Sequence, residues 1–263
     1  MSEILTPDTA LNTDLTKPLD AAAVEAELTA LAARYRAAGG LGIQILNLLG
    51  GSVDGLLDKL PAPVRSRLDG ATEQALQLAM QGASGSRRVL PDQPSGVNRA
   101  VSAAMGAAGG MGGLPGALVE LPATTAFLLR SIQGVAAEEG FDPEADGVRF
   151  DCIRVFASAG PLAADDGADL GFLSLRLGLT GGAVQKLIAQ VAPRLSVVLG
   201  QKLAAQTVPV LGAVAGATTN FVYAGYYQEM ARVHFGLRRL AVAADQPHEV
   251  LVARLQDRLL APR

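Results

Sequence analysis

Residues 100–119 read AVSAAMGAAGGMGGLPGALV, and residues 203–228 read LAAQTVPVLGAVAGATTNFVYAGYYQ. Neither stretch contains a residue that is charged at neutral pH. Alanine favours helix, whereas each glycine costs a helix roughly 1 kcal/mol relative to alanine. Such stretches must either be shielded from water in a closely packed helical core or dip into a bilayer. The choice between these two environments decides what kind of protein this is.

A second feature relates the two stretches to each other. Pro115 is followed by Ala-Thr-Thr-x-Phe at 123–127, and Pro209 is followed by the same motif at 217–221, with equal spacing. One interpretation is a degenerate internal duplication, which predicts two equivalent helical hairpins packed as a pair. The other is chance similarity within an Ala/Gly-rich chain. The sequence leaves both interpretations open.

Composition favours an all-α protein. The chain has 263 residues, enough to bury a large core; 49% are hydrophobic but only 4% are aromatic, and Trp is absent. Ala and Leu are strong helix formers, and the aromatic patterning typical of strands is missing. The net charge is −3, with no basic run. We therefore expect no nucleic-acid partner and no strong, purely electrostatic attraction to an anionic membrane.

The domain organisation expected is one helical domain over 19–263, preceded by a flexible arm over 1–18. The arm is polar and lacks the basic and apolar regions of a signal peptide. We therefore expect a cytoplasmic protein, with the inner face of the cell membrane as its place of peripheral attachment. The single cysteine, Cys152, excludes an intramolecular disulfide and a multi-thiolate metal site.

Helical spacing and breaker residues predict the elements. A helix over 20–38 would be capped by Asp20 and ended by Gly39-Gly40, and a broken helix or turn is expected between Ala107 and Gly116. Pro122 would occupy the first turn of a helix that includes 124–137. Amphipathic helices at 20–38, 62–81, 144–159 and 229–242 would wrap two central charge-free hairpins, and a short helix over 247–260 would close the chain. Six small or proline positions are predicted to set close packing or membrane insertion: Gly109, Gly113, Pro115, Pro209, Gly212 and Gly216.

Polar residues close to the apolar segments are the candidate site. The candidates are Glu120, Thr124, Thr125, Arg130, Ser131, His234 and Arg239. One interpretation is a buried network in which Glu120 pairs with Arg130 or Arg239, because buried charges need partners. The other is a cleft that binds an anion or a lipid head group. The two threonines after Pro122 are also explained by helix capping or by back-bonding within the helix.

Catalytic and cofactor motifs are weak. A hydrolase could use Ser131 or Ser158 with His234 and Asp151, but the chain has no Gly-x-Ser-x-Gly elbow. Cys152 and the histidines lack the spacing of zinc ligands. The glycine-rich run 109–113 is not followed by the Gly-Lys-Ser/Thr of a P-loop. We therefore predict no catalytic residue, no cofactor and no metal.

Several segments together resemble the EcsC protein family. These are 120–125 (ELPATT), 129–132 (LRSI), Ala136, 139–140, 152–156, 208–212 with Asn220, and Ala231, His234, Phe235 and Arg239. The resemblance covers roughly 50–242 and implies a mostly helical bacterial protein. Because the family takes its name from a gene beside an ABC exporter, components of such an exporter are implied partners. The resemblance implies no catalytic residues.

Three functional hypotheses follow. The favoured one is a non-catalytic, lipid- or membrane-associated accessory protein, whose central hairpins could enclose a groove for acyl chains. Tyr223, Tyr226 and Tyr227 lie where apolar sequence meets charge, as aromatic residues at membrane interfaces do, although Gly, Ala, Thr and Pro drive insertion weakly. The alternatives are a hydrolase acting on a lipid-like substrate and a protein-interaction module whose glycine faces pair with another subunit. The sequence does not specify an oligomeric state.

Overall fold

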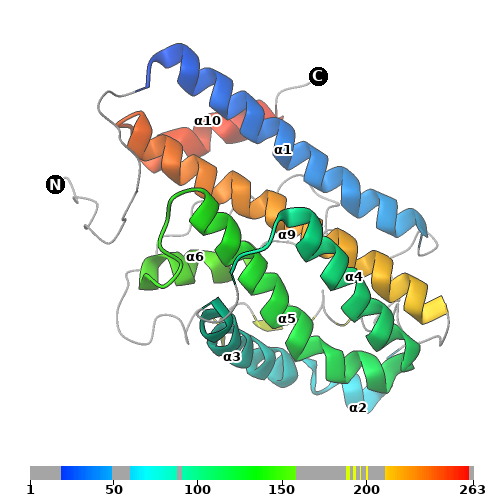
Figure 1. Cartoon of the computed structure of the whole chain (residues 1–263). Coiled ribbons are helices and arrows are strands. Elements are labelled where there is room, and N and C mark those ends of the chain that lie inside the picture. The colour runs from blue at the N-terminus through cyan, green and yellow to red at the C-terminus, as the bar shows by residue number, and fades with distance from the viewer. Residues whose placement is uncertain are drawn as a thin grey trace.

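The described part of the chain is helical. The computed structural model describes residues 19–48, 60–87, 91–157 and 211–260, together with Ile188, Ala189, Ala192, Pro193, Ser196 and Gly200. These residues contain helices and no strand, which confirms the all-α class (Figure 1). The helices are α1 (Ala21–Leu48), α2 (Ala62–Arg65), α3 (Leu68–Arg87), α4 (Ser95–Met111), α5 (Gly113–Glu138), α6 (Asp146–Ala157), α9 (Leu211–Ala243) and α10 (His248–Leu260).

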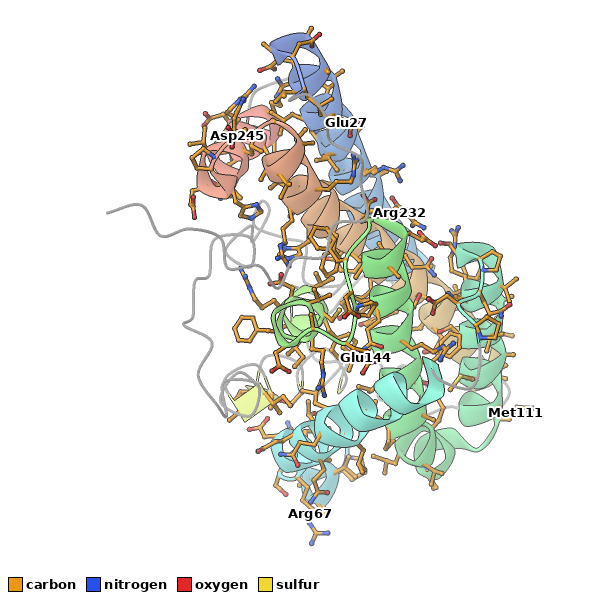
Figure 2. All side chains as sticks on the ribbon, turned by 60° about the vertical axis from the view of Figure 1, so that its left-hand side comes forward. Glu27, Arg67, Met111, Glu144, Arg232 and Asp245 are labelled. Atoms are coloured by element: carbon orange, nitrogen blue, oxygen red, sulfur yellow. The ribbon has the colours of Figure 1, made fainter. Side chains whose placement is uncertain are left out.

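The long helix α9 organises the other elements. Its 33 residues span about 50 Å, at about 1.5 Å per residue. It contacts α1, α4, α5, α6 and α10. Figure 1 shows α4 beside its first half and α1 and α10 along its second half. Figure 2 shows Glu27 and Asp245 at one end of the molecule and Met111 at a different edge.

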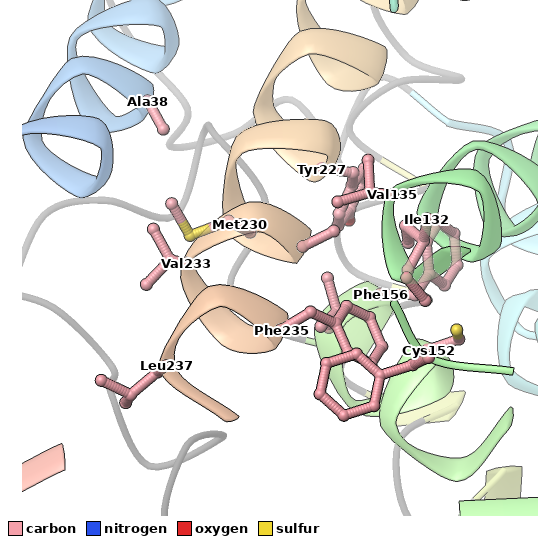
Figure 3. Packing of buried hydrophobic residues seen from close by; sticks show 14 of the residues in the cluster. Ala38, Ile132, Val135, Cys152, Phe156, Tyr227, Met230, Val233, Phe235 and Leu237 are labelled. Atoms are coloured by element: carbon pink, nitrogen blue, oxygen red, sulfur yellow. The ribbon is translucent and has the colours of Figure 1, made fainter. Parts of the chain in front are cut away.

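The hydrophobic core surrounds the second half of α9. The ring centroids of Phe235 and Phe141 lie 5.5 Å apart, and those of Tyr227 and Phe156 lie 4.9 Å apart. Figure 3 shows Tyr227 and Phe235 directed toward Phe156, on the opposite side of α9 from Val233 and Leu237. Residues 229–242 were expected to wrap the centre, but most of this segment is itself buried. The helix is continuous through Gln228 and Glu229. Residues 229–242 therefore continue the charge-free stretch that ends at Gln228 and carry the same helix into the core.

The start of α1 follows the prediction, but its end does not. The amide of Ala23 donates to Asp20 Oδ1 at 2.8 Å, which confirms Asp20 as the N-cap. The predicted stop at Gly39-Gly40 is wrong, because α1 continues to Leu48. A glycine ends a helix most effectively in a left-handed conformation, which Gly140 adopts after α5 with φ 89°. Neither Gly39 nor Gly40 has a positive φ.

The glycine-rich turn was predicted correctly, but the role of Pro122 was not. α4 ends at Met111, Gly112 forms the turn, and α5 begins at Gly113. Pro115, not Pro122, lies in the first turn, where its missing N–H costs nothing. Pro122 lies inside α5 and removes one helical hydrogen bond there. The predicted helix start at Pro122 is therefore wrong.

The remaining predicted elements agree with the structure or cannot be compared with it. Helices α6 and α10 match the predicted 144–159 and 247–260, and the predicted 62–81 is divided into α2 and α3. Within the described residues, no helix is both long and apolar enough to cross a membrane. The arm 1–18, Ser158, Pro209 and 203–210, which would complete a second hairpin, lie outside the described residues.

Candidate functional site

A buried polar network joins α4, α5 and α9. Asn220 Nδ2 on α9 donates to the Ser102 carbonyl of α4 at 3.0 Å and to Glu120 Oε1 of α5 at 2.9 Å. Ser102 Oγ donates back to the Asn220 carbonyl at 3.2 Å. Thr124 Oγ1 donates to the same Glu120 oxygen from one turn along α5. Thr124 is therefore not the predicted capping residue but a partner of Glu120.

Glycines permit this network by letting the helices approach closely. A Cβ atom added to Gly106 would lie 2.1 Å from the Gly216 carbonyl oxygen and 2.7 Å from Asn220 Nδ2. A Cβ atom on Gly109 would lie 2.5 Å from Glu120 Oε2. Gly109 and Gly216, two of the predicted close-packing or membrane-insertion positions, therefore lie where neighbouring groups approach closely. Gly113 and Gly212 lie in the first turns of α5 and α9.

A second polar contact holds the same helices further along α9. Gln228 Nε2 donates to Ser131 Oγ at 2.8 Å and approaches the Ser95 carbonyl at 3.3 Å. Ser131 is buried. His234 lies six residues beyond Gln228, about 9 Å further along the helix axis. The described structure therefore does not bring Ser131 to His234 in the way that a hydrolase nucleophile and base require.

His234 instead belongs to a cluster around Asp151. His234 Nε2 lies 3.3 Å from Asp151 Oδ2, Arg154 lies 3.3 Å from Oδ1, and Arg238 pairs with Oδ2. Arg238 also covers the Phe141 ring, with its guanidinium carbon 4.8 Å from the ring centroid. The His234 and His248 rings lie 6.4 Å apart. This cluster ties α6 to α9 and α10.

Burial and charge set the protonation states in this cluster. Burial alone would raise the pKa of Asp151, but His234, Arg238 and Arg154 hold this pKa below its usual range. Burial lowers the pKa of His234, and the two neighbouring arginines lower it further against the opposing effect of Asp151. Burial, with His234 and Arg238, lowers the pKa of His248 to about 4. At neutral pH the cluster therefore contains an ionised carboxylate and neutral imidazoles.

The predicted arginine partners of Glu120 lie elsewhere. Arg130 approaches Asp92 at 3.9 Å and donates to the Pro91 carbonyl at 3.1 Å. Arg239 pairs with Glu139 at 2.8 Å and with Glu27 at 3.4 Å. The prediction that Glu120 pairs with Arg130 or Arg239 is therefore wrong. Of the seven candidates, Glu120 and Thr124 lie in one network, whereas Arg130, Ser131, His234 and Arg239 each contact other partners.

Some buried polar groups have no hydrogen-bond partner. They include the hydroxyls of Thr125, Thr219 and Tyr223 and both amide atoms of Gln133. Thr219 and Tyr223 are one turn apart on α9, and burial raises the pKa of Tyr223 well above its usual range. Thr125 therefore does not share the bonded role of Thr124. Among the described residues, no group of His, Cys, Asp and Glu could hold a metal ion.

An exposed apolar surface is the feature that the sequence prediction missed. Seven of the ten exposed large hydrophobic side chains in the described residues lie on α4, the first half of α5 and the first half of α9. We call this set the apolar face, and it comprises Val97, Val101, Met111, Leu118, Val119, Val214 and Phe221. Three of its members are 65–82% exposed: Val119 (82%), Val214 (69%) and Met111 (65%). The charge-free stretches therefore form a surface as well as a packing interface.

Helix α4 packs against its neighbours with one side and forms part of the apolar face with the other. Ser102, Gly106 and Gly109 are buried, whereas Val97, Val101, Ala104, Ala108 and Met111 are exposed. These five exposed positions follow i, i+4, i+7, i+11 and i+14, which places them on one side of the helix. This spacing was present in the sequence. In the sequence the spacing could not distinguish the exposed side of α4 from the buried side, because both sides are uncharged.

The comparisons with known proteins give a family and no individual relative. A protein-family model described as the EcsC protein family matches residues 85–240. No curated protein and no solved structure matches the chain significantly. The matched region runs from the end of α3 through α4, α5 and α6 to residue 240 of α9, and so includes the Glu120–Asn220 network and the Asp151 cluster. It covers more than half of the sequence, and the chain therefore belongs to the EcsC protein family.

Proposed function

We propose that this protein is a non-catalytic accessory protein that docks on the surface of a lipid membrane through its apolar face. The observation that carries the proposal is the gathering of seven exposed large hydrophobic side chains on three neighbouring helices. Soluble proteins rarely expose large continuous apolar patches without a binding purpose. Transfer of an exposed aliphatic side chain into hydrocarbon contributes about 1.5–3 kcal/mol. Several such side chains together are enough for reversible binding.

The packing of the helices fits shallow docking. The opposite sides of α4 and α5 are tied to α9 through Ser102, Glu120 and Asn220. Only the outer sides of these helices are free to enter an apolar phase. Helices that bind in this way bury their apolar sides about 5–10 Å into the head-group boundary. Because the inner polar network stays paired, docking requires no unfolding.

The binding of a double variant to lipid vesicles tests the proposal. Val119→Asp with Val214→Asp places two carboxylates on the apolar face at positions that are already exposed. We expect vesicle affinity to fall by at least about tenfold, since each valine contributes more than 1 kcal/mol on insertion. Val250→Asp on α10 is the matched control, because Val250 is 46% exposed and lies outside the apolar face. Equal binding by all three proteins would reject the proposal.

An ABC exporter is a proposed partner at that membrane. Membership of the EcsC family supports this link, since the family takes its name from a gene beside such an exporter. A photocrosslinking amino acid at position 97, on the edge of the apolar face, provides the test in cells. Crosslinks to exporter subunits support the link. Crosslinks to lipid alone contradict it and leave membrane docking in place.

A further inference from the structure

We infer that the apolar face recognises an uncharged, loosely packed bilayer, one that is strongly curved or rich in unsaturated chains. The inference rests on the proposed function and adds the class of lipid surface that the protein selects. Recognition would depend on hydrocarbon exposed between head groups, not on head-group charge. Three observations support this: the charge of the helices, the engagement of their two charged residues, and the size of the exposed side chains.

The helices that form the apolar face are almost free of charge. Residues 95–128 contain one cation, Arg99, and one anion, Glu120, while residues 211–228 contain no charged residue. Their net charge is therefore zero. Membrane proteins that select anionic lipids carry clusters of Lys and Arg, each contributing about 1 kcal/mol near the surface. The apolar face has no such cluster.

The two charged residues are also engaged within the protein. The Arg99 guanidinium lies over the Phe221 ring, 5.7 Å from its centroid. Glu120 Oε1 accepts hydrogen bonds from Thr124 and Asn220 in the buried network. Neither residue is placed as an independent charge for a lipid head group.

Several basic residues elsewhere in the described part of the chain are paired with acids. Arg254 and Arg258 on α10 both pair with Glu25 of α1. Arg67 lies in a different part of the molecule from Met111 (Figure 2).

The middle of α4 exposes only small side chains. Between Val101 and Met111, the exposed positions of α4 are alanines. An alanine buries little apolar area, so binding depends on the few larger groups, of which Val119, Val214 and Met111 are the most exposed. Few bulky groups on a weakly charged helix bind well only where lipid packing leaves hydrocarbon accessible, which makes such binding sensitive to curvature and composition.

The width of the apolar face favours a bilayer over a second copy of the chain. The α4 positions alone repeat with a spacing of about 3.5 residues, which would suit a single partner helix. The apolar face also includes Val119 on α5 and Val214 on α9, which a seam along α4 does not explain. An extended surface over three helices suits a broad, deformable partner. A second copy of the chain is the competing partner for the apolar face, and the experiment must distinguish it from a bilayer.

The experiment compares full-length protein on vesicles that differ in one property at a time. Small unsaturated phosphatidylcholine vesicles are compared with large saturated phosphatidylcholine vesicles, and then with vesicles that contain phosphatidylserine, between about 0.1 M and about 1 M salt. We expect affinity to be about tenfold or more higher for the small unsaturated vesicles. We expect phosphatidylserine and salt to change it less than about twofold, because the Debye length shortens from about 10 Å to about 3 Å without a charge to screen.

Two variants connect the result to the apolar face. Met111→Ala with Phe221→Ala should remove the preference for small unsaturated vesicles, whereas Leu260→Ala, at a 74% exposed position on α10, should retain it. Val214→Lys should acquire binding to phosphatidylserine that is lost in salt. Wild-type binding that requires phosphatidylserine, or that is equal on large saturated vesicles, overturns this inference but not membrane docking. Absence of binding to every vesicle overturns both, as does a stable dimer in solution that Val119→Asp dissociates.

Discussion

Gly106 of α4 lies against Gly216 of α9 so closely that a Cβ atom on Gly106 would come within 2.1 Å of the Gly216 carbonyl oxygen. The nearest atom belongs to backbone, which cannot turn aside as a flexible side chain can. The Ser102–Asn220 bonds lie one turn away on both helices. The close approach of α4 to α9 is therefore the condition for the polar network beneath the apolar face.

Gly106→Ala should destabilise the protein. The added methyl must move α4 away from α9, and overpacking of this kind costs about 1–3 kcal/mol or more. Urea unfolding followed by circular dichroism measures the change. Gly39→Ala is the control, since a Cβ there meets nothing within 4 Å and should stabilise α1 by up to about 1 kcal/mol. A Gly106→Ala variant with the same free energy of unfolding as wild type would contradict the close approach of α4 to α9.

Asn220→Ala should weaken the junction between α4, α5 and α9. The substitution removes the hydrogen bond to the Ser102 carbonyl and the charge-assisted hydrogen bond to Glu120, at a cost of about 1–3 kcal/mol. Asn98→Ala is the matched control, because the Asn98 side chain donates to the exposed Gln93 carbonyl. Both variants are compared with wild type by urea unfolding. If Asn220→Ala and Asn98→Ala lost the same free energy of unfolding, the buried network would contribute no more to stability than an exposed hydrogen bond.

Acid should destabilise the protein in two stages. The pKa values of His234 and His248 are lowered by folding, so the unfolded chain binds more protons and stability falls as pH drops below about 6.5. With a folded pKa of about 4, His248 alone accounts for a loss of about 3 kcal/mol by pH 4. The pKa of Asp151 is also lowered, and its contribution, present above its unfolded pKa near 3.8, is lost at lower pH.

His248→Gln separates the histidine effect from general acid denaturation. The variant should show a shallower decline in the free energy of unfolding between pH 6.5 and about 4 than wild type. Unfolding in urea at a series of pH values gives the slopes. A variant slope equal to that of wild type in this range would reject the assignment to His248.

Val119→Asp and Val214→Asp should leave stability almost unchanged. Both side chains are mostly exposed, and substitutions at such positions usually alter the free energy of unfolding by less than about 0.5 kcal/mol. Thermal melts in lipid-free buffer provide the measurement. A large loss of stability would mean that these valines support the fold, and that any loss of vesicle binding reflects unfolding.

The sequence predicted local structure best where a single residue had a specific backbone role. Asp20 was identified as a cap and the region of Gly112 as a break, because hydrogen bonding and glycine at those positions have local consequences. Pro122 and Gly39 were misinterpreted because tertiary packing can maintain a helix through a proline or a glycine pair. Local preference is a weak guide when the surrounding helix has a packed side.

The candidate site was harder to predict than the fold. The sequence identified Glu120 and His234 as important polar residues, but it gave Glu120 an arginine partner and grouped His234 with Asp151 only as part of a hydrolase alternative. Asn220 and Asp151 proved to be the partners, and they come from parts of the chain 100 and 83 residues away. The apolar face escaped prediction because an uncharged helix shows no contrast between a side that packs and a side that faces outward. Only the arrangement of α4, α5 and α9 distinguishes those sides.

Flotation of the full-length protein with small, unsaturated phosphatidylcholine vesicles in about 1 M salt tests the central claim most directly, since screening at that salt removes surface attraction. Wild type and Val250→Asp should float with the vesicles, while the protein carrying Val119→Asp and Val214→Asp should stay in the dense fraction. Failure of wild type to float, or equal flotation of the double variant, would contradict membrane docking through the apolar face.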